Sequence, residues 1–217
     1  MDAMIGSYDD EPFESNFLSQ YKNLLHHFVH QTSNIRASTF WGACGAIRRD
    51  VFLKIGGFDK KYRRPSIEDI DLGYRLKKAG YRIYLLKQIQ VKHLKHWGIF
   101  SLLKADIFYR ALPWTDLIFN DGRIIDDLNL KRASRISVIA VFMLRSAVIG
   151  SVYSAWILVP MTILIALLLG LNWDLYRFFK EKRGLVFAVK TISWHWLYFF
   201  TVASFRLLVL PDIRLSD

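Results

Sequence analysis

Three carboxylate side chains lie within four consecutive residues, at Glu68, Asp69 and Asp71, in a chain that is otherwise basic. A carboxylate within hydrogen-bond reach of a hydroxyl group can act as a general base. Acidic residues at the start of a helix also stabilise the helix dipole, by about 0.3 to 1 kcal/mol each. Asp71 can pair with Arg75 one turn further along, which requires no function. The cluster therefore has two interpretations, a general base and the start of a helix.

The residues around the acidic cluster predict a short helix that ends at a glycine. Ser66, with Asp69 three residues later, forms a variant of the capping box that begins many helices. Apolar residues follow at helical spacing as far as Gly80, which stops the helix. Two short strands are predicted next, at 81–86 and 89–93. The carboxylates should thus lie at the N-terminal end of a helix that precedes two strands.

Before the cluster, the sequence predicts a strand that ends near 4–8 and an amphipathic helix that begins after Ser15 or Asn16. Residues 39–48 are predicted to form a strand interrupted by glycines, and residues 49–55 a short helix. Strands and helices therefore alternate ahead of the acidic cluster.

The charge distribution favours a membrane partner over a nucleic acid. The 217 residues include 30 Lys and Arg against 19 Asp and Glu, a net charge of +11, yet the first 21 residues contain no Lys or Arg. Basic residues instead flank the apolar C-terminal third, at Lys131, Arg132 and Arg135 before it and between 177 and 183 within it. Cationic flanks of this kind meet anionic lipid head groups, whereas a nucleic-acid binder more often carries a basic stripe on a soluble domain.

The C-terminal third predicts a membrane hairpin at 136–172. No charged residue lies between 146 and 173, and the apolar sequence extends back to residue 136 with Arg145 as the single interruption. A helix needs about 20 apolar residues to span a bilayer, so this stretch is too long for one untilted span. Two legs joined by a turn near 150–154 fit better, with Pro160 expected to kink the second leg. Because both ends are basic, both are expected in the cytoplasm.

The last segment, 173–217, contains a third apolar stretch that runs from 184 to 210 and is rich in aromatic residues. Trp and Tyr are common at membrane–water interfaces. This stretch is compatible with an interfacial helix and with a third membrane segment, and both interpretations remain open. The intervening residues 98–135 are predicted to form interfacial helices and a linker, because the sequence is mostly apolar from 97 to 112.

Four short motifs around the acidic cluster together resemble the acceptor-side, C-terminal half of family 2 glycosyltransferases, which have a GT-A fold. They are GGFD at 56–59, IEDIDLGYRL at 67–76, AGYRI at 79–83 and VKH at 91–93. The preceding GACGAIRRDVF is similar to the strand and helix that lead into this region in the family. The resemblance covers residues 1–97 and implies an α/β, Rossmann-like, partial GT-A domain. A helical transmembrane region after it suits the membrane-bound members of the family.

The resemblance also implies roles for individual residues. In such enzymes the aspartate of the Glu-Asp pair is the general base, and the matching residue is Asp69. Glu68 is expected to orient the loop or the acceptor. A histidine late in the domain can contribute to the metal or diphosphate site, and His93 is the candidate. The implied cofactor is a divalent cation, Mg²⁺ or Mn²⁺, which stabilises the charge of the departing nucleotide diphosphate.

Five further residues are candidates for binding the donor or the acceptor: Gly45, Arg48, Asp71, Arg110 and Trp114. Gly45 could let the backbone approach a donor sugar or could mark a strand bulge. Arg48 could meet a diphosphate or could lie at a solvated helix start. Arg110 and Trp114 loosely resemble an Arg-Trp element beside the acceptor channel of processive members, and they could equally anchor a surface helix at a bilayer.

One large departure from the family concerns its nucleotide-binding half. That half carries the nucleotide-binding strands and an Asp-x-Asp metal motif, and no residue before 42 replaces it. We therefore expect this chain to be a fragment that is inactive without that half.

Two functions stay open. The first is transfer of a sugar from a nucleotide-sugar to a lipid-linked or saccharide acceptor, by a multi-pass membrane protein whose GT-A-like domain faces the cytoplasm. The second is a non-catalytic membrane subunit or scaffold. No nucleic-acid partner is expected.

Overall fold

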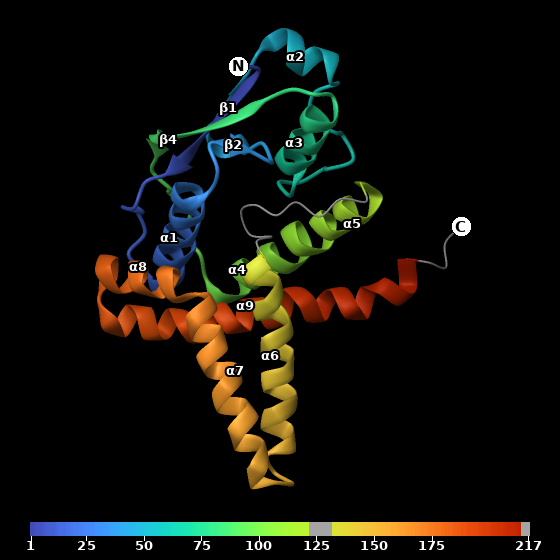
Figure 1. Ribbon diagram of the computed structural model, residues 1–217. Helices are drawn as coiled ribbons and strands as arrows, with labels where there is room; N and C mark the ends of the chain where they lie inside the picture. The colour runs from blue at the N-terminus through green and yellow to red at the C-terminus, as the bar shows by residue number, and fades with distance from the viewer. Residues whose placement is uncertain (122–131, 214–217) are drawn as a thin grey trace. The chain divides into compact units, whose positions relative to one another are not determined.

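The structure is a computed structural model that describes residues 1–121 and 132–213, with side chains described for 1–120 and 132–201. The chain divides into two compact units, Met1–Asn129 and Leu130–Asp217. Within the described residues, the first unit contains all the strands and the second is helical (Figure 1). The α/β class expected for the N-terminal part is confirmed.

The first unit is built on a mixed sheet of four strands in the order β2-β4-β1-β3. The strands are β1 (Ala3–Tyr8), β2 (Arg36–Ala37), β3 (Gly45–Ile47) and β4 (Ile83–Val91). The two longest strands, β1 and β4, are parallel neighbours, and each is flanked by a short antiparallel strand. Parallel neighbours end at the same edge of a sheet, so the residues that follow β1 and β4 lie close together.

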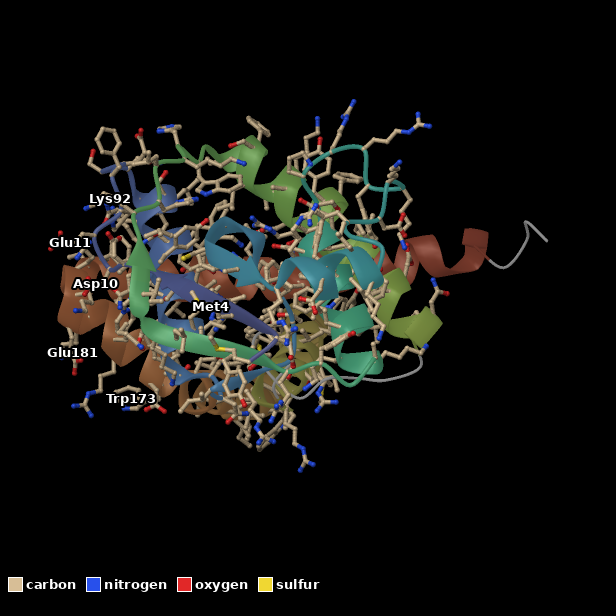
Figure 2. All side chains as sticks on the ribbon, turned by 90° about the horizontal axis from the view of Figure 1, so that it is seen from above. Met4, Asp10, Glu11, Lys92, Trp173 and Glu181 are labelled. Carbon is tan, nitrogen blue, oxygen red and sulfur yellow. The ribbon has the colours of Figure 1, made fainter. Side chains whose placement is uncertain are left out.

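The chain after β1 is tied to the end of β4 by hydrogen bonds. The amide of Asp9 donates to the carbonyl oxygen of Val91 at 3.1 Å. Lys92 Nζ donates to the carbonyl oxygen of Glu11 at 2.8 Å, and Figure 2 shows these two residues next to each other. The segments that follow both strands are therefore held together.

Helices connect and cover the strands of the first unit. They are α1 (Phe17–Thr32), the 3₁₀ turn Gly42–Cys44, α2 (Arg49–Lys54), α3 (Glu68–Lys78), α4 (Ile99–Lys104), the π-helix Ala105–Ala111 and α5 (Leu112–Asp121). Helix α1 contacts β1 and β4, and α3 contacts β4. The core consists of buried apolar side chains: Ala3, Ile5, Ala37, Phe40, Val51, Leu72, Leu76, Ile83 and Leu85. Removal of these side chains from water is the main favourable term that holds the helices on the sheet.

Helix α3 forms where it was predicted, but its predicted capping box does not. The N-cap residue is Ile67, and the hydroxyl of Ser66 donates to the carbonyl oxygen of Tyr109 instead of closing the helix start. Acidic residues in the first turn and basic residues in the last turn complement the helix dipole. The predicted stop at Gly80 is confirmed, since its φ of +84° is a conformation that glycine adopts readily.

Two strand predictions were wrong. Residues 81–93 contain the single strand β4, which absorbs an irregularity in its pairing with β1 instead of breaking in two. Residues 39–48 contain only the short strand β3, because the 3₁₀ turn folds the chain back before it. A Cβ atom at Gly45 would approach the carbonyl oxygen of Trp41 to 2.7 Å, which shows how tight this fold-back is. Gly45 therefore serves the turn.

A close backbone contact seats α3 against the chain before the 3₁₀ turn. A Cβ atom added to Gly73 would lie 2.2 Å from the amide nitrogen of Phe40 and 2.7 Å from backbone carbons of Thr39. Ordinary contact requires about 3.5 Å, so only glycine fits here. Glycine inside a helix is normally less favourable than alanine by about 0.5 to 1 kcal/mol, and the close packing explains its use. As a result, the first turn of α3 lies beside Gly42.

The second unit contains, among the described residues, α6 (Arg132–Gly150), α7 (Leu158–Leu171), α8 (Trp173–Arg183) and α9 (Leu185–Ile213). Helices α6 and α7 pack together and are joined through a turn at 151–154 and a 3₁₀ turn, so the predicted helical hairpin is present. Its core consists of buried apolar side chains from α6, α7 and α9: Ala140, Val141, Leu144, Leu164, Leu168 and Phe199.

Two residues of this unit, Arg145 and Pro160, interrupt its apolar sequence, and only Pro160 differs from expectation. Arg145 finds a partner, because its guanidinium carbon lies 3.7 Å from the ring centroid of Phe200, in a cation–π contact. Pro160 lies in the first turn of α7, where its missing amide costs little, so it does not kink the helix. The chain instead bends by 65° between α7 and α8, near Asn172, whose Nδ2 donates to the carbonyl oxygen of Leu168 at 2.9 Å.

Among the described helices, α6 alone is both long and apolar enough to cross a membrane. The segment from Ala155 to Arg183 is a second candidate if its two bent halves are taken as one span. The core helix of a soluble protein meets the same criterion, so insertion of the hairpin into a bilayer remains a prediction.

Candidate functional site

A cleft of about 640 Å³ lies in the first unit, where the segments that follow β1 and β4 meet the start of α3. Its walls come from Tyr8, the turn at 41–43, the loop 58–66, the first residues of α3, residues 95–97 and the π-helix. Ligands of sheets with parallel strands bind beyond the carboxyl ends of those strands. Sites for small ligands typically measure about 300 to 1,000 Å³, so this cleft has the position and the size of a binding site.

Asp69 lines this cleft and is held there by two backbone amides. Its Oδ2 accepts a hydrogen bond from the amide of Gly42, and its Oδ1 accepts one from the amide of Ile70, both at 2.8 Å. Burial raises the pKa of Asp69 above its ordinary value of 3.8, with a smaller contribution from Glu68, while the two amides oppose the shift. A carboxylate with a raised pKa is a better proton acceptor at neutral pH. Its position in the cleft and its raised pKa are therefore two features expected of a general base.

Glu68 lines the cleft next to Asp69 and closes the preceding loop. Its Oε2 accepts a hydrogen bond from the amide of Ser66 at 2.7 Å. The hydroxyl of Ser66 donates to the carbonyl oxygen of Tyr109 at 2.6 Å, which links this loop to the π-helix. The expectation that Glu68 orients the loop agrees with these contacts.

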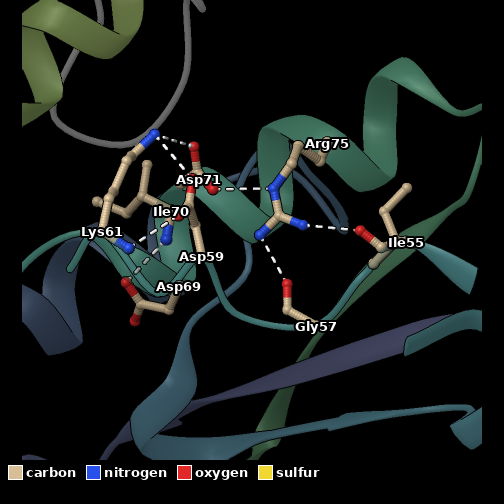
Figure 3. Close-up of polar contacts among 8 residues, drawn as sticks. All are labelled: Ile55, Gly57, Asp59, Lys61, Asp69, Ile70, Asp71 and Arg75. Carbon is tan, nitrogen blue, oxygen red and sulfur yellow. Dashed lines mark hydrogen bonds and ion pairs between the residues drawn. The ribbon is translucent and has the colours of Figure 1, made fainter. Parts of the chain in front are cut away.

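Asp71, a candidate for substrate binding, is buried and does not line the cleft. Its Oδ2 accepts a hydrogen bond from Arg75 Nε at 2.9 Å, and its Oδ1 lies 3.5 Å from Lys61 Nζ (Figure 3). Arg75 also donates to the carbonyl oxygens of Ile55 and Gly57, at 2.9 and 2.8 Å. Through Arg75, Asp71 therefore holds the end of α2 and the loop after it against α3. This is the alternative interpretation, in which Asp71 pairs with Arg75 and needs no role in binding.

Arg110 lines the cleft and is anchored by a buried carboxylate. Its Nη1 donates to Asp106 Oδ1 at 2.8 Å, and Lys22 Nζ donates to the same oxygen at 2.7 Å. The side chains of Lys22 and Asp106 are each only 5% exposed. Burial lowers the pKa of Lys22 to about 8, although Asp106 opposes this shift. The π-helix, a conformation that is frequent at functional sites, thus presents a fixed guanidinium to the cleft.

His93 lies behind the wall of the cleft. Its ring centroid is 4.5 Å from that of Tyr8, which does line the cleft. Burial, assisted by Lys95 and Arg110, lowers its pKa to about 4, and its Nδ1 is buried without a hydrogen-bond partner. Neutral imidazole is the form that binds metals. However, the side chains that the structure describes include no group of three His, Cys, Asp or Glu that could hold a metal ion, so they do not by themselves fit a cation site.

The other three candidates do not line the cleft. Gly45 serves the fold-back before β3, as described above. Arg48 is exposed, and its Nη2 lies 2.7 Å from Asp50 Oδ2. It therefore lies at a solvated helix start, which was the alternative to binding a diphosphate. Trp114 Nε1 donates to the hydroxyl of Tyr74 at 3.4 Å. The cleft therefore brings Glu68, Asp69 and Arg110 together and leaves these three out.

Sequence reasoning missed most of the side chains in the cleft. Six of them are aromatic: Tyr8, Trp41, Phe58, Tyr62, Trp97 and Tyr109. Three basic side chains accompany Arg110: Arg63, Arg64 and Lys95. A signal for some of them exists in the loop sequence KKYRRPS at 60–66, which mixes basic and aromatic residues just before the acidic cluster. The others carry no local signal, because only the fold brings them to Asp69.

Comparison with known proteins points to sugar transfer. Residues 23–97, which include Asp69 and His93, match a family described as the N-terminal domain of galactosyltransferase. Two curated proteins from Mycobacterium tuberculosis, of strains CDC 1551 / Oshkosh and ATCC 25618 / H37Rv, are similar to this chain, with 43% identity over 54 residues. Each is described as an N-acetylglucosaminyl-diphospho-decaprenol L-rhamnosyltransferase. No solved structure matches the chain significantly.

These matches are partial. The shared segment covers 25% of this chain and 17% of each mycobacterial relative. Both kinds of match nevertheless point to the same class of protein. The first unit therefore contains a glycosyltransferase-like domain.

Proposed function

We propose that the first unit is the acceptor side of a family 2, GT-A-type glycosyltransferase. It would help to move a sugar from a nucleotide-sugar donor to a hydroxyl group of a lipid-linked or saccharide acceptor. The observation that carries the proposal is Asp69, a carboxylate with a raised pKa that two amides hold in a cleft of suitable size. The name of the mycobacterial relatives includes N-acetylglucosaminyl-diphospho-decaprenol, which supports a lipid-linked acceptor. Turnover is expected to require a nucleotide-binding half in addition to these residues.

In the proposed reaction, the acceptor hydroxyl donates a hydrogen bond to the carboxylate of Asp69. As the hydroxyl oxygen attacks the anomeric carbon of the donor sugar, its proton passes to Asp69. The bond between the anomeric carbon and the diphosphate oxygen breaks, and the nucleoside diphosphate leaves with that electron pair. Arg110, anchored by Asp106, stabilises the negative charge that develops. Tyr8 and Trp41, whose ring centroids are 4.6 Å apart, restrict the access of water to the reacting atoms.

A divalent cation, Mg²⁺ or Mn²⁺, belongs to this proposal only through the family resemblance. When bound, it would offset the negative charge of the diphosphate. His93 is the residue that we propose to contact it, because its imidazole is neutral and has a free Nδ1. The remaining ligands would have to be diphosphate oxygens and residues other than the described ones.

The variant Asp69→Asn, made in a protein that also contains a nucleotide-binding half and assayed in membrane vesicles, tests the role of the carboxylate. General base catalysis contributes about 10²- to 10⁴-fold, so turnover of UDP-, GDP- or dTDP-sugars should fall by at least about 10²-fold while donor binding persists. The matched control is Asp50→Asn, which removes an exposed carboxylate outside the cleft and should leave turnover unchanged. Unaltered turnover in Asp69→Asn would refute the base. A wild type that uses none of these donors would instead favour the non-catalytic scaffold.

We further propose that the hairpin of α6 and α7 anchors the protein in a membrane, with the glycosyltransferase-like unit facing the cytoplasm. The turn of the hairpin carries apolar and aromatic side chains that are almost fully exposed: Val152 at 82%, Tyr153 at 87% and Trp156 at 84%. A soluble protein rarely exposes such residues together, whereas a bilayer would cover them.

A further inference from the structure

Three basic side chains in the cleft have no carboxylate partner among the residues whose side chains the structure describes. Arg63 and Arg64 come from the loop before α3, and Lys95 comes from the segment after β4. By contrast, Lys61 of the same loop lies 3.1 Å from the carboxylate of Asp59. Within the part of the chain whose side chains are described, these three positive charges in the cleft therefore have no carboxylate at ion-pair distance.

The loop that carries the two arginines is fixed at both ends. The carbonyl oxygen of Gly57 accepts a hydrogen bond from Arg75 at 2.8 Å, and Ser66 donates to the carbonyl oxygen of Tyr109 at 2.6 Å. Arg64 also donates a hydrogen bond to the side-chain oxygen of Tyr109, and this contact lowers the pKa of Tyr109. Side chains that are held before a ligand arrives lose less conformational entropy on binding. The fixed loop ends and the contact with Tyr109 thus restrict Arg64 before a ligand binds, and Arg63 is its neighbour in the same loop.

Lys95 adds a third cation from a different element. Its Nζ lies 3.9 Å from the ring centroid of Trp97, a buried residue that lines the cleft. Burial and, to a smaller extent, the charge of Arg110 lower the pKa of Lys95. A cation that burial and a like charge destabilise gains most from a nearby anion.

From this arrangement we propose that Arg63, Arg64 and Lys95 bind a diphosphate ester in the cleft. A guanidinium group donates two parallel hydrogen bonds to phosphate oxygens, and an ammonium group supplies a compact positive charge. Two linked phosphates present several negative oxygens, which three cations from two elements can meet together. The inference rests on the proposed function, because that reaction offers two sources of the group. They are the nucleoside diphosphate of the donor and a polyprenyl diphosphate on the acceptor.

The test measures binding to the purified full chain in detergent micelles by isothermal titration. The probes are inorganic pyrophosphate, UDP and geranyl diphosphate, each titrated at about 0.15 M salt so that long-range attraction is screened. Empty micelles give the blank. Pyrophosphate measures the shared chemistry, while UDP and geranyl diphosphate represent the donor and the acceptor.

The double variant Arg63→Ala/Arg64→Ala should bind pyrophosphate at least about tenfold more weakly, because each lost charge-assisted hydrogen bond is worth about that factor. Lys95→Ala should weaken binding as well. Arg63→Lys/Arg64→Lys keeps the charge but loses the forked geometry, so it should fall between the wild type and the alanine variant. The matched control is Lys54→Ala/Lys60→Ala, which removes two exposed charges outside the cleft and should change affinity less than about twofold.

The two sources give different results. A loss confined to pyrophosphate and UDP assigns the site to the donor, and a loss confined to pyrophosphate and geranyl diphosphate assigns it to the acceptor. Equal affinity of wild type and Arg63→Ala/Arg64→Ala for all three probes, with unchanged melting temperature, overturns the proposal, as does an equal loss in the control. Asp69→Asn should bind pyrophosphate at least as tightly as the wild type. An active Asp69→Asn with a defective arginine variant would therefore refute only the base.

Discussion

The variant Gly73→Ala tests whether the contact between α3 and the chain before it positions Asp69. The added Cβ would lie 2.2 Å from the amide nitrogen of Phe40, about 1.3 Å inside an ordinary contact of about 3.5 Å. The obstacle is backbone, so α3 must move away by about 1 Å. The hydrogen bond from Gly42 to Asp69, now 2.8 Å long, would then exceed the range of such bonds, about 2.7 to 3.2 Å.

Two effects should follow from this displacement. Overpacking costs about 1 to 3 kcal/mol, which a thermal melt will detect. A misplacement of about 1 Å in a reacting group can cost about 10²-fold in turnover, which a sugar-transfer assay on the full-length protein will detect. The matched control is Gly170→Ala in α7, where a Cβ would meet nothing within 4 Å and where helix propensity favours alanine. Wild-type melting and turnover in Gly73→Ala would refute the reasoning.

Three further predictions concern other parts of the chain. Because Asp69 must be ionised to accept a proton and its pKa is raised, kcat/KM should fall on acidification with a midpoint above 3.8, and a midpoint at or below that value would contradict the assignment. Asp106→Asn removes the carboxylate that forms an ion pair with the buried Lys22 and should lower the free energy of unfolding by about 3 to 5 kcal/mol, measured by urea denaturation with the exposed Asp50→Asn as control. In a Cys44→Ser background, Val152→Cys should resist an impermeant maleimide added to the cytoplasmic face of membrane vesicles, whereas Lys54→Cys should react. Equal labelling of both would contradict the membrane hairpin.

Elements whose signals are local could be predicted from the sequence. The helix after Asn16, the helix that starts at Glu68 and the glycine that stops it all depend on neighbours a few residues away. The helical hairpin was predicted for the same reason, since a long apolar run with a glycine near its middle leaves few alternatives. The Ser66 cap failed because a distant acceptor, the carbonyl oxygen of Tyr109, competes for the hydroxyl.

The site was predictable only in part. The acidic motif identified Glu68 and Asp69, which do line the cleft, but it could not show that Asp71 turns toward Arg75 and Lys61 instead. Alternation around the helix places neighbouring carboxylates on different faces, and only packing decides which face meets a cavity. The signal that was overlooked is Gly73, since a glycine inside a helical pattern often marks a close approach of another chain segment.

The two backbone amides that hold Asp69 also affect the proton that this residue would take up in the proposed reaction. Both groups are donors, so they favour the ionised carboxylate over the acid that forms once a proton has been taken up. Burial acts in the opposite direction and favours the acid, and the net result is a raised pKa of Asp69. In the proposed reaction, a protonated Asp69 would therefore release its proton less readily than a carboxylic acid in water, and the next transfer would depend on a proton acceptor that reaches the cleft.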